Sequence, residues 1–441
     1  MGHIILRNYR FMKFIVFFYI LACMGTSCLT LPHAFAKDGS NGAIHSTRIT
    51  ADIFGRRSRH IHPFLSLSSL YSDNLYRTVE DKKEGWGLLA MPAIWISLPG
   101  LKTDLDPMGI SPTTTGGMMY RPYDDPDSRR FLFYLNGRMG VERYADHSEE
   151  NTTTGAVETR LIYRMRNGAA FTINGQQNRS HDKRGESLST RLEKYTSNYL
   201  KTQMTYSPHG KLSLAAGLSL FDVDYDSSAY RFRDRTDTAF SIDIGYPILP
   251  KTRLFLEYTR FNIDYREQAM EQVREDQYNL GLSWYISAKS RGVVKAGYGI
   301  RTFDKSDESS NEDYILEARI NYKVSGDTSV SFTTYKQYQE TRIPNTDYID
   351  TLGCTATCLY QLTSKVFLDL KLDYTADDFF GDGKRTGDEK TFAVSPSAGY
   401  QMGKWLTFKL EYTFEQRSSS YSTDSRDANT NAIVFNVTAG V

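Results

Sequence analysis

Charged residues recur at alternate positions of extended segments, and this spacing is the first chemical signal in the chain. In DYILEARINYK, Glu317, Arg319 and Lys323 share one parity, while Leu316 and Ile320 belong to the other. Because successive side chains of a β-strand point to opposite faces, this segment has one charged and one apolar face. The same parity rule selects a set of charged candidate residues: Arg138, Glu142, Glu158, Arg160, Arg164, Asp243, Glu257, Lys295, Arg301, Glu317, Arg319, Lys323, Asp369, Lys371, Asp373, Lys409 and Glu411.

Motifs for enzymatic chemistry do not occur in the sequence. There is no G-x-S-x-G, no H-E-x-x-H and no P-loop, and the histidines after Lys37 stand outside any recognisable motif. The acidic segment FFGDGKRTGDE lacks the ligand spacing of an EF-hand. We therefore expect no enzyme activity, no catalytic residues, no cofactor and no metal site.

Two cysteines, Cys354 and Cys358, lie four residues apart in GCTATCLYQL. In a regular strand their α-carbons would be about 13 Å apart, which is too far for a disulfide bond. A metal site would need further histidine or cysteine ligands nearby, and none is evident. The spacing favours small side chains that face lipid.

The elements that carry the charged faces are best seen between Gln277 and Val324, where one motif is written twice. Each copy has an alternating run of roughly ten residues, a tight polar turn and another alternating run. The apolar parity begins and ends in tyrosine, as in Tyr314 and Tyr322. Strands with an apolar, aromatic-ended outer face and a polar inner face are typical of membrane-spanning β-barrels, which must close to satisfy their backbone.

The pattern repeats along the chain and predicts about eighteen strands, with sixteen as the alternative. Short turns such as RNG and VSGD alternate with long charged loops such as NIDYREQAMEQVRED. In bacterial outer-membrane barrels the short turns are periplasmic and the long loops extracellular. The predicted fold is an all-β, transmembrane, antiparallel up-and-down β-barrel. The strands are expected at 62–71, 86–98, 131–142, 156–166, 169–178, 195–206, 211–221, 238–247, 251–262, 277–287, 291–303, 313–323, 327–338, 348–361, 365–376, 390–401, 404–416 and 430–441.

The N-terminus is typical of an export signal, with basic residues before an apolar run and the small residues Ala34 and Ala36 before Lys37. We expect a signal peptide at 1–36, a periplasmic tail at 37–60 and a single barrel domain at 61–441. An irregular connection at 99–130, rich in Pro, Gly, Thr and Asp, interrupts the strand pattern. A plug or constriction inside the barrel and a simple long loop are equally compatible with its length.

The charged faces are expected to line the lumen, because charges near the bilayer midplane would each cost a few kcal/mol if they faced lipid. A barrel of sixteen to eighteen strands is wide enough for an aqueous channel. The mixed signs argue against a dedicated phosphate pore, which would show rings of Arg or Lys. The alternative is a partly filled lumen in which Glu317 and Arg319, or Asp369 and Lys371, neutralise one another.

The net charge argues against nucleic acid as a partner. The whole chain carries +1, and removal of Arg7, Arg10 and Lys13 with the signal peptide gives 1 − 3 = −2. A near-neutral protein lacks the basic surface that binds phosphate backbones.

The segment from Leu67 to Leu98 resembles the opening of an outer-membrane β-barrel porin family often encoded in exopolysaccharide gene clusters. There, a first strand ends in a Y-x-D-N-x-Y phrase, represented here by Tyr71, Asp73, Asn74 and Tyr76, and a second strand ends near a proline, here Pro99. The irregular 99–130 stretch departs from the family, whose next strand comes sooner. The resemblance implies a role in moving secreted polysaccharide and contact with the exopolysaccharide secretion machinery.

Together these observations predict a porin-like channel in the bacterial outer membrane, surrounded by lipid. It would be a passive conduit for exopolysaccharide or small hydrophilic solutes. The alternative is a structural or adhesive barrel with a closed lumen.

Overall fold

The computed structural model describes residues 60–101, 105, 107–120, 130–182, 184–185, 192–208, 212–267, 272–287, 289–304, 310–344, 346–382, 384–420 and 427–440. Within these residues one antiparallel sheet contains eighteen strands. They are β1 (Ile61–Ser72), β2 (Gly85–Leu98), β3 (Phe131–Tyr144), β4 (Thr152–Arg164), β5 (Ala169–His181), β6 (Lys194–Tyr206), β7 (Ser213–Tyr225), β8 (Arg235–Leu249), β9 (Thr252–Tyr265), β10 (Val273–Ser287), β11 (Ser290–Phe303), β12 (Ser310–Lys323), β13 (Thr328–Glu340), β14 (Tyr348–Gln361), β15 (Val366–Gly381), β16 (Lys384–Met402), β17 (Leu406–Ser419) and β18 (Ala428–Gly440).

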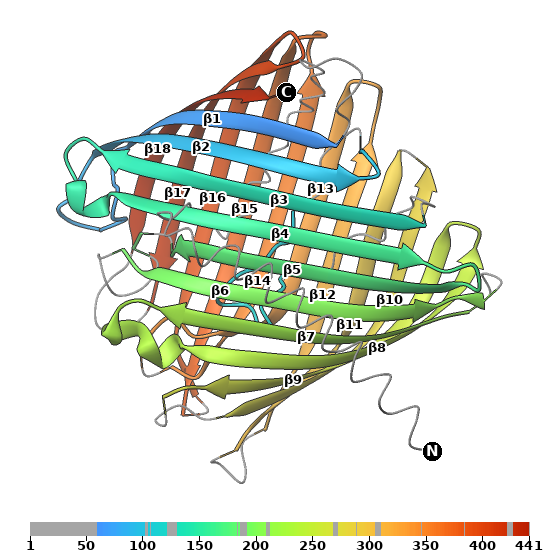
Figure 1. The fold of residues 1–441 in the computed structure, drawn as a ribbon. Helices are drawn as coiled ribbons and strands as arrows, with labels where there is room; N and C mark the ends of the chain where they lie inside the picture. Colours follow the sequence, from blue (N-terminus) through green and yellow to red (C-terminus); the bar gives the residue numbers. More distant parts are fainter. Residues whose placement is uncertain are drawn as a thin grey trace, which may run out of the picture.

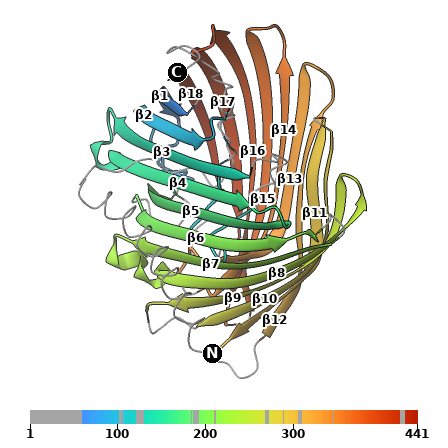
Figure 2. The same ribbon diagram turned by 45° about the vertical axis from the view of Figure 1, so that its right-hand side comes forward.

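The sheet closes on itself, because β1 pairs with both β2 and β18. The β1–β18 register runs from Phe64↔Gly440 to Ser72↔Ala432. Figures 1 and 2 show the resulting tilted wall, with the first strand beside the last. The predicted eighteen-strand antiparallel barrel is confirmed, and the alternative of sixteen strands is wrong.

The two faces of the wall differ as the alternation predicts. On β12, Tyr314 and Tyr322 point outward and are 60% and 50% exposed, whereas Glu317 and Arg319 on the other parity are buried. Each strand pairs with two neighbours, so the backbone polar groups are satisfied within the wall, as a membrane requires. Among the described residues, no helix is long and apolar enough to cross a membrane.

The two rims of the barrel are built differently. We call the rim with the turns β4–β5, β12–β13 and β14–β15 the short-turn rim, and the opposite one the long-loop rim. The latter carries two short 3₁₀ helices, η1 (Ser148–Glu150) and η3 (Ser228–Arg233).

Strands reach further toward the long-loop rim than the sequence pattern predicts. β7 continues to Tyr225 and β8 begins at Arg235, whereas the sequence pattern predicts a loop over residues 222–237. In these extensions the outer parity is polar, as at Asp222, Asp224 and Thr236. The apolar outer stripe that identifies a membrane strand therefore ends there, while backbone pairing continues. The predicted signal peptide and nearly all of the predicted 37–60 tail lie outside the described residues.

An internal loop held by buried charges: the candidate functional site

Part of the irregular connection between β2 and β3 forms a small hairpin inside the barrel. We call residues 107–120 the internal loop. Ile110 and Met118 form a β-bridge, and the Met119 amide donates to the Gly109 carbonyl at 2.8 Å. Gly117 has a φ of +77°, and a Cβ there would lie 2.2 Å from the Phe221 ring. Only glycine fits this tight, left-handed turn against the wall.

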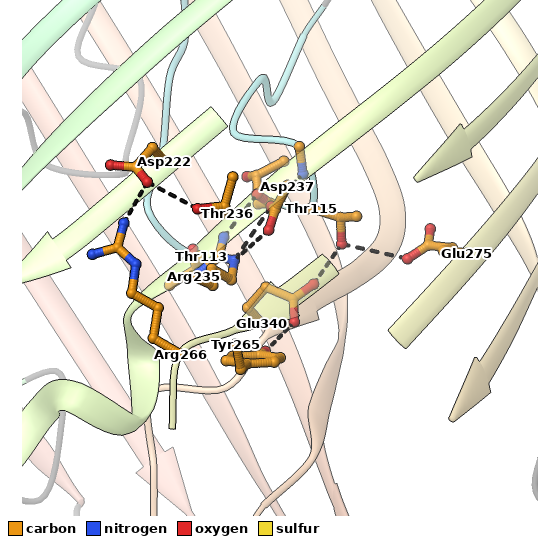
Figure 3. A network of polar contacts seen from close by, with 12 residues as sticks. Thr113, Thr115, Asp222, Arg235, Thr236, Asp237, Tyr265, Arg266, Glu275 and Glu340 are labelled. Carbon is orange, nitrogen blue, oxygen red and sulfur yellow. Dashed lines mark hydrogen bonds and ion pairs between the residues drawn. The ribbon is translucent and has the colours of Figure 1, made fainter. Parts of the chain in front are cut away.

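The tip of the internal loop is hydrogen-bonded to two strands that are not neighbours in the sheet. The Glu340 amide of β13 donates to the Thr113 carbonyl at 2.7 Å, and the Thr115 hydroxyl donates to the Glu340 carboxylate at 2.8 Å. The Gly116 amide donates to the Asp237 carboxylate of β8 at 2.9 Å. Figure 3 shows these carboxylates converging on the tip. The loop therefore joins separate strands rather than lying along one strand.

The groups that hold the tip belong to a buried network of charges. Arg301 of β11 lies between Glu275 of β10, at 3.2 Å, and Glu340, at 2.7 Å. Arg235 pairs with Asp237 at 3.1 Å. All five side chains are at most 2% exposed. Charges this deeply buried are stable only when paired, and removing one partner of such a pair costs about 3–5 kcal/mol.

The network also contains a tyrosine and a backbone contact. Tyr265 of β9 donates its hydroxyl to Glu340, and Arg235 donates to the Thr114 carbonyl at 3.2 Å. Figure 3 places Tyr265 beneath Glu340, with Asp222, Thr236 and Arg266 as a neighbouring group. The loop tip is thus part of the network rather than a segment resting on it.

An apolar cluster anchors the base of the internal loop. Met108 is 2% exposed, and it packs with residues of β6 and β7: Tyr195, Tyr199, Phe221, Val223 and Tyr225. Its amide donates to the Glu158 carboxylate of β4 at 3.2 Å. On the far side, Arg319 of β12 lies 5.5 Å above the Tyr120 ring, a cation–π contact. The loop is therefore fixed at its base, tip and far end.

A cavity of about 120 Å³ lies between the internal loop and the wall. Its lining includes the charged side chains of Lys201, Glu257, Lys295 and Glu317, together with Asn279. Lys295 bridges Glu257 at 2.8 Å and Glu317 at 3.2 Å. A cavity of this size has room for several water molecules beside these charged side chains.

At the long-loop rim, a segment between β5 and β6 reaches across to the other side of the opening. Arg417 of β17 donates to the Arg77 carbonyl at 2.7 Å and to the Gly185 carbonyl at 2.5 Å. Nearby, burial raises the pKa of Tyr76 to about 12, so its hydroxyl stays protonated and donates to Glu149 at 3.2 Å. These contacts cover part of the mouth.

Most of the charged candidates from the sequence occur as ion pairs. Asp243 pairs with Arg253, and Glu142 lies 3.4 Å from both His181 and Arg184. Further pairs are Glu158–Arg160 at 2.6 Å, Glu317–Arg319 at 2.9 Å, Lys371–Asp373 at 2.8 Å, Lys409–Glu411 at 2.7 Å and Asp369–Lys409 at 3.8 Å. Arg138 and Arg164 are half-buried on the same parity of their strands, and Lys323 is exposed near the short-turn rim.

Sequence reasoning did not select the residues that hold the loop tip, apart from Arg301. The strands that the sequence predicts do not include Arg235, Asp237, Glu275 or Glu340, because these residues lie beyond the apolar outer stripe. A usable signal was present, since Arg235 and Asp237 continue the parity of Asp243 along β8.

Cys354 and Cys358 both have free thiols, as their spacing along the strand predicts. In the described part of the chain, no group of three or more His, Cys, Asp or Glu side chains is arranged to hold a metal ion.

The closed wall, its lipid-facing exterior and its charged interior define an antiparallel β-barrel of the bacterial outer membrane. Residues 127–440 match the family described as "Putative beta-barrel porin 2", and since the match spans most of the chain, the protein belongs to that porin-like family. The matched region begins after the Leu67–Leu98 opening that suggested a porin family, so the later strands carry the assignment. No curated protein matches the chain in sequence.

Three crystal structures of Pseudomonas aeruginosa outer-membrane proteins illustrate the similarity in fold. OpdK has 12% sequence identity and a TM-score of 0.43, with 86% of this chain and 99% of that chain covered. OpdO has 10% identity and a TM-score of 0.42, with 87% and 98% covered. OprD has 12% identity and a TM-score of 0.40, with 86% and 95% covered. Because these scores are low, the fold rests on the strand pairing described above.

Proposed function

We propose that the protein is a passive, non-enzymatic conduit for small hydrophilic solutes across the outer membrane, narrowed by the internal loop. The carrying observation is the polar cavity beside the loop, where Lys201, Lys295, Glu257 and Glu317 face the same space. In this proposal the short-turn rim is periplasmic, so the loop enters from the periplasm and is anchored close to the extracellular side.

The arrangement of charge supports a weak ion preference. Candidate pore-lining residues alternate in sign along and across strands, as in the Glu257–Lys295–Glu317 series. A lumen lined in this way has no continuous row of charges of one sign, so strong selection for anions or cations is not expected. Neutral or weakly charged solutes fit this lining best.

A role in exopolysaccharide export is supported only by the family resemblance of the opening segment. A polymer would need a wider passage than the cavity beside the internal loop, so this role requires the loop to leave its anchors. The secretion machinery would then be a partner at the periplasmic rim.

The test is conductance of the refolded mature chain in planar bilayers, under a salt gradient that reports ion preference. We expect stable steps of weak selectivity, and steps several-fold larger when residues 107–120 are replaced by a short Gly-Ser linker. Folding of each protein is verified by its heat-dependent gel mobility. Silence from both folded proteins would contradict the conduit and favour the structural or adhesive barrel with a closed lumen.

A further inference from the structure

The wall of the barrel is split between β12 and β13 near the long-loop rim. The β12–β13 ladder runs only from Lys323↔Ser329 to Leu316↔Lys336. Beyond this ladder, toward the long-loop rim, residues 310–315 of β12 remain paired with β11, and residues 337–340 of β13 remain paired with β14. Among the described residues, the upper part of β13 instead bridges the internal loop, at Thr114↔Gln339.

The upper parts of β13 and β14 fold inward past this split. Phe332 and Tyr338 belong to the same, lipid-facing parity of β13, yet Phe332 is 40% exposed and Tyr338 only 4%. Tyr338 packs in a cluster with Ile263, Val273 and Phe303, which lie on the buried parity of β9, β10 and β11. The outer face of one part of the wall therefore contacts the inner face of another.

Glu340 secures this inward position. It lies on the parity of Phe332, but pairs with Arg301 of β11 at 2.7 Å. Tyr348, on the corresponding outer parity of β14, stacks on Phe380 at 4.9 Å and lies 6.0 Å from Phe303. Gly299 leaves room for this packing, since a Cβ there would lie 3.3 Å from the Tyr338 ring.

A row of tyrosines indicates a second position for β13. Tyr258, Tyr278, Tyr298 and Tyr314 are direct cross-strand partners on β9 to β12, and the last three are 51%, 43% and 60% exposed. Continuing the β12–β13 register by two residues from Leu316↔Lys336 sets Tyr338 opposite Tyr314. Tyrosines in such a row anchor a barrel at the membrane interface.

The Tyr338 hydroxyl is buried and unsatisfied in the inward position. It has no hydrogen-bond partner among the described residues, and burying such a group costs about 1–3 kcal/mol. In the tyrosine row the hydroxyl would lie at the lipid–water interface, where it is hydrated. The gain of this hydration, together with a completed ladder, opposes the loss of the Glu340–Arg301 pair.

We propose that the paired strand ends of the β13–β14 hairpin, residues 337–340 of β13 and 348–350 of β14, form a gate with two positions. In the inward position it narrows the lumen and holds the internal loop. In the outward position β13 completes its ladder with β12, Tyr338 joins the tyrosine row, and the loop loses its bonds to Gln339 and Glu340. The outward movement of the hairpin end does not depend on the proposed conduit, whereas its action as a gate rests on that proposed function.

Disulfide trapping in native outer membranes tests the outward register. In a Cys354→Ala/Cys358→Ala background, Tyr314→Cys with Tyr338→Cys is oxidised with copper phenanthroline. The positive control is Ala318→Cys with Thr334→Cys, a pair in the existing ladder with the same face and pairing type. Tyr314→Cys with Gln337→Cys, which point to opposite faces in the outward register, is the negative control.

We expect the 314–338 pair to link to at least a tenth of the extent of the 318–334 control, and the negative control not to link. Glu340→Gln, which removes the carboxylate that pairs with Arg301 in the inward position, should raise 314–338 linking several-fold. The two-position hairpin would be overturned if the 318–334 pair links but the 314–338 pair does not, both with and without the additional substitution.

Conductance then separates the gate from the conduit. The linked 314–338 protein should conduct in larger steps than the same protein after reduction. Equal steps before and after reduction would overturn the gate. If linking occurs but no folded variant conducts ions, the outward movement of the hairpin end is supported and the proposed conduit is contradicted.

Discussion

The two ends of the lumen carry similar charges in different surroundings. Near the long-loop rim, Arg301, Glu275 and Glu340 are at most 1% exposed and hold the internal loop. Toward the short-turn rim, the Lys409 and Glu411 side chains are 28% and 35% exposed. Buried pairs are costly to break, whereas pairs in contact with solvent contribute little to stability and rearrange easily. Charge near the long-loop rim therefore fixes structure, and charge toward the short-turn rim remains in contact with solvent.

The largest contrast is expected from matched substitutions at the two ends. Arg301→Gln leaves two buried carboxylates without their cation, and should lower the free energy of unfolding by about 3–5 kcal/mol. Lys409→Gln should lower it by less than about 1 kcal/mol. Urea titrations followed by tryptophan fluorescence compare the two, and equal losses would mean that the ends do not differ in this way.

Neighbouring residues on β15 sharpen the comparison by adding the outer face of the wall. Leu370 is 41% exposed toward lipid, so Leu370→Arg places a charge in hydrocarbon and should cost about 2–4 kcal/mol. Asp369→Asn, on the inner parity, should assemble almost normally. The measurement is the yield of heat-modifiable barrel in outer membranes, and similar yields would contradict the assignment of faces.

A smaller effect is expected at the turn of the internal loop. Gly117→Ala places a side chain at a left-handed position, which costs about 1–2 kcal/mol, and directs its Cβ into the Phe221 ring. The loop should move from its anchors, and single-channel steps should grow without loss of barrel assembly. Gly326→Ala is the control, because no atom lies within 4 Å of a Cβ there. Unchanged steps in Gly117→Ala would show that the loop does not limit conductance.

The smallest effect concerns ion preference toward the short-turn rim. Lys371→Glu places an acid beside Asp373, with which Lys371 pairs at 2.8 Å. The reversal potential under a salt gradient should shift toward cations by a few millivolts, since one charge among many changes the field only slightly. Stability should remain near that of the natural protein. A shift toward anions would contradict placement of Lys371 in the conducting path.

Much of the wall could be predicted from sequence because its physics is local. In membrane strands, side-chain polarity alternates residue by residue. The faces of Tyr314, Leu316 and Glu317 can therefore be assigned from the neighbouring residues alone. The strand number followed from the same pattern. The site could not be predicted in this way, because it joins strands far apart in sequence and lies beyond the end of the apolar outer stripe.

Glu340 illustrates this limit. Its parity places it on the lipid-facing side of β13, and only the inward fold of the hairpin end brings it to Arg301. The internal loop is a similar case, since the 99–130 segment has no period that distinguishes an internal hairpin from a long external loop. Its partners Glu158, Asp237 and Glu340 belong to three separate strands.

The same three contacts give the internal loop a mechanical consequence. Because the loop is hydrogen-bonded to β4, β8 and β13 at once, these strands cannot move apart without breaking its contacts. We expect this brace to limit changes in the shape of the barrel's cross-section. Without the brace, the barrel should sample many cross-sections, so channels lacking residues 107–120 should conduct in a broad spread of steps instead of one.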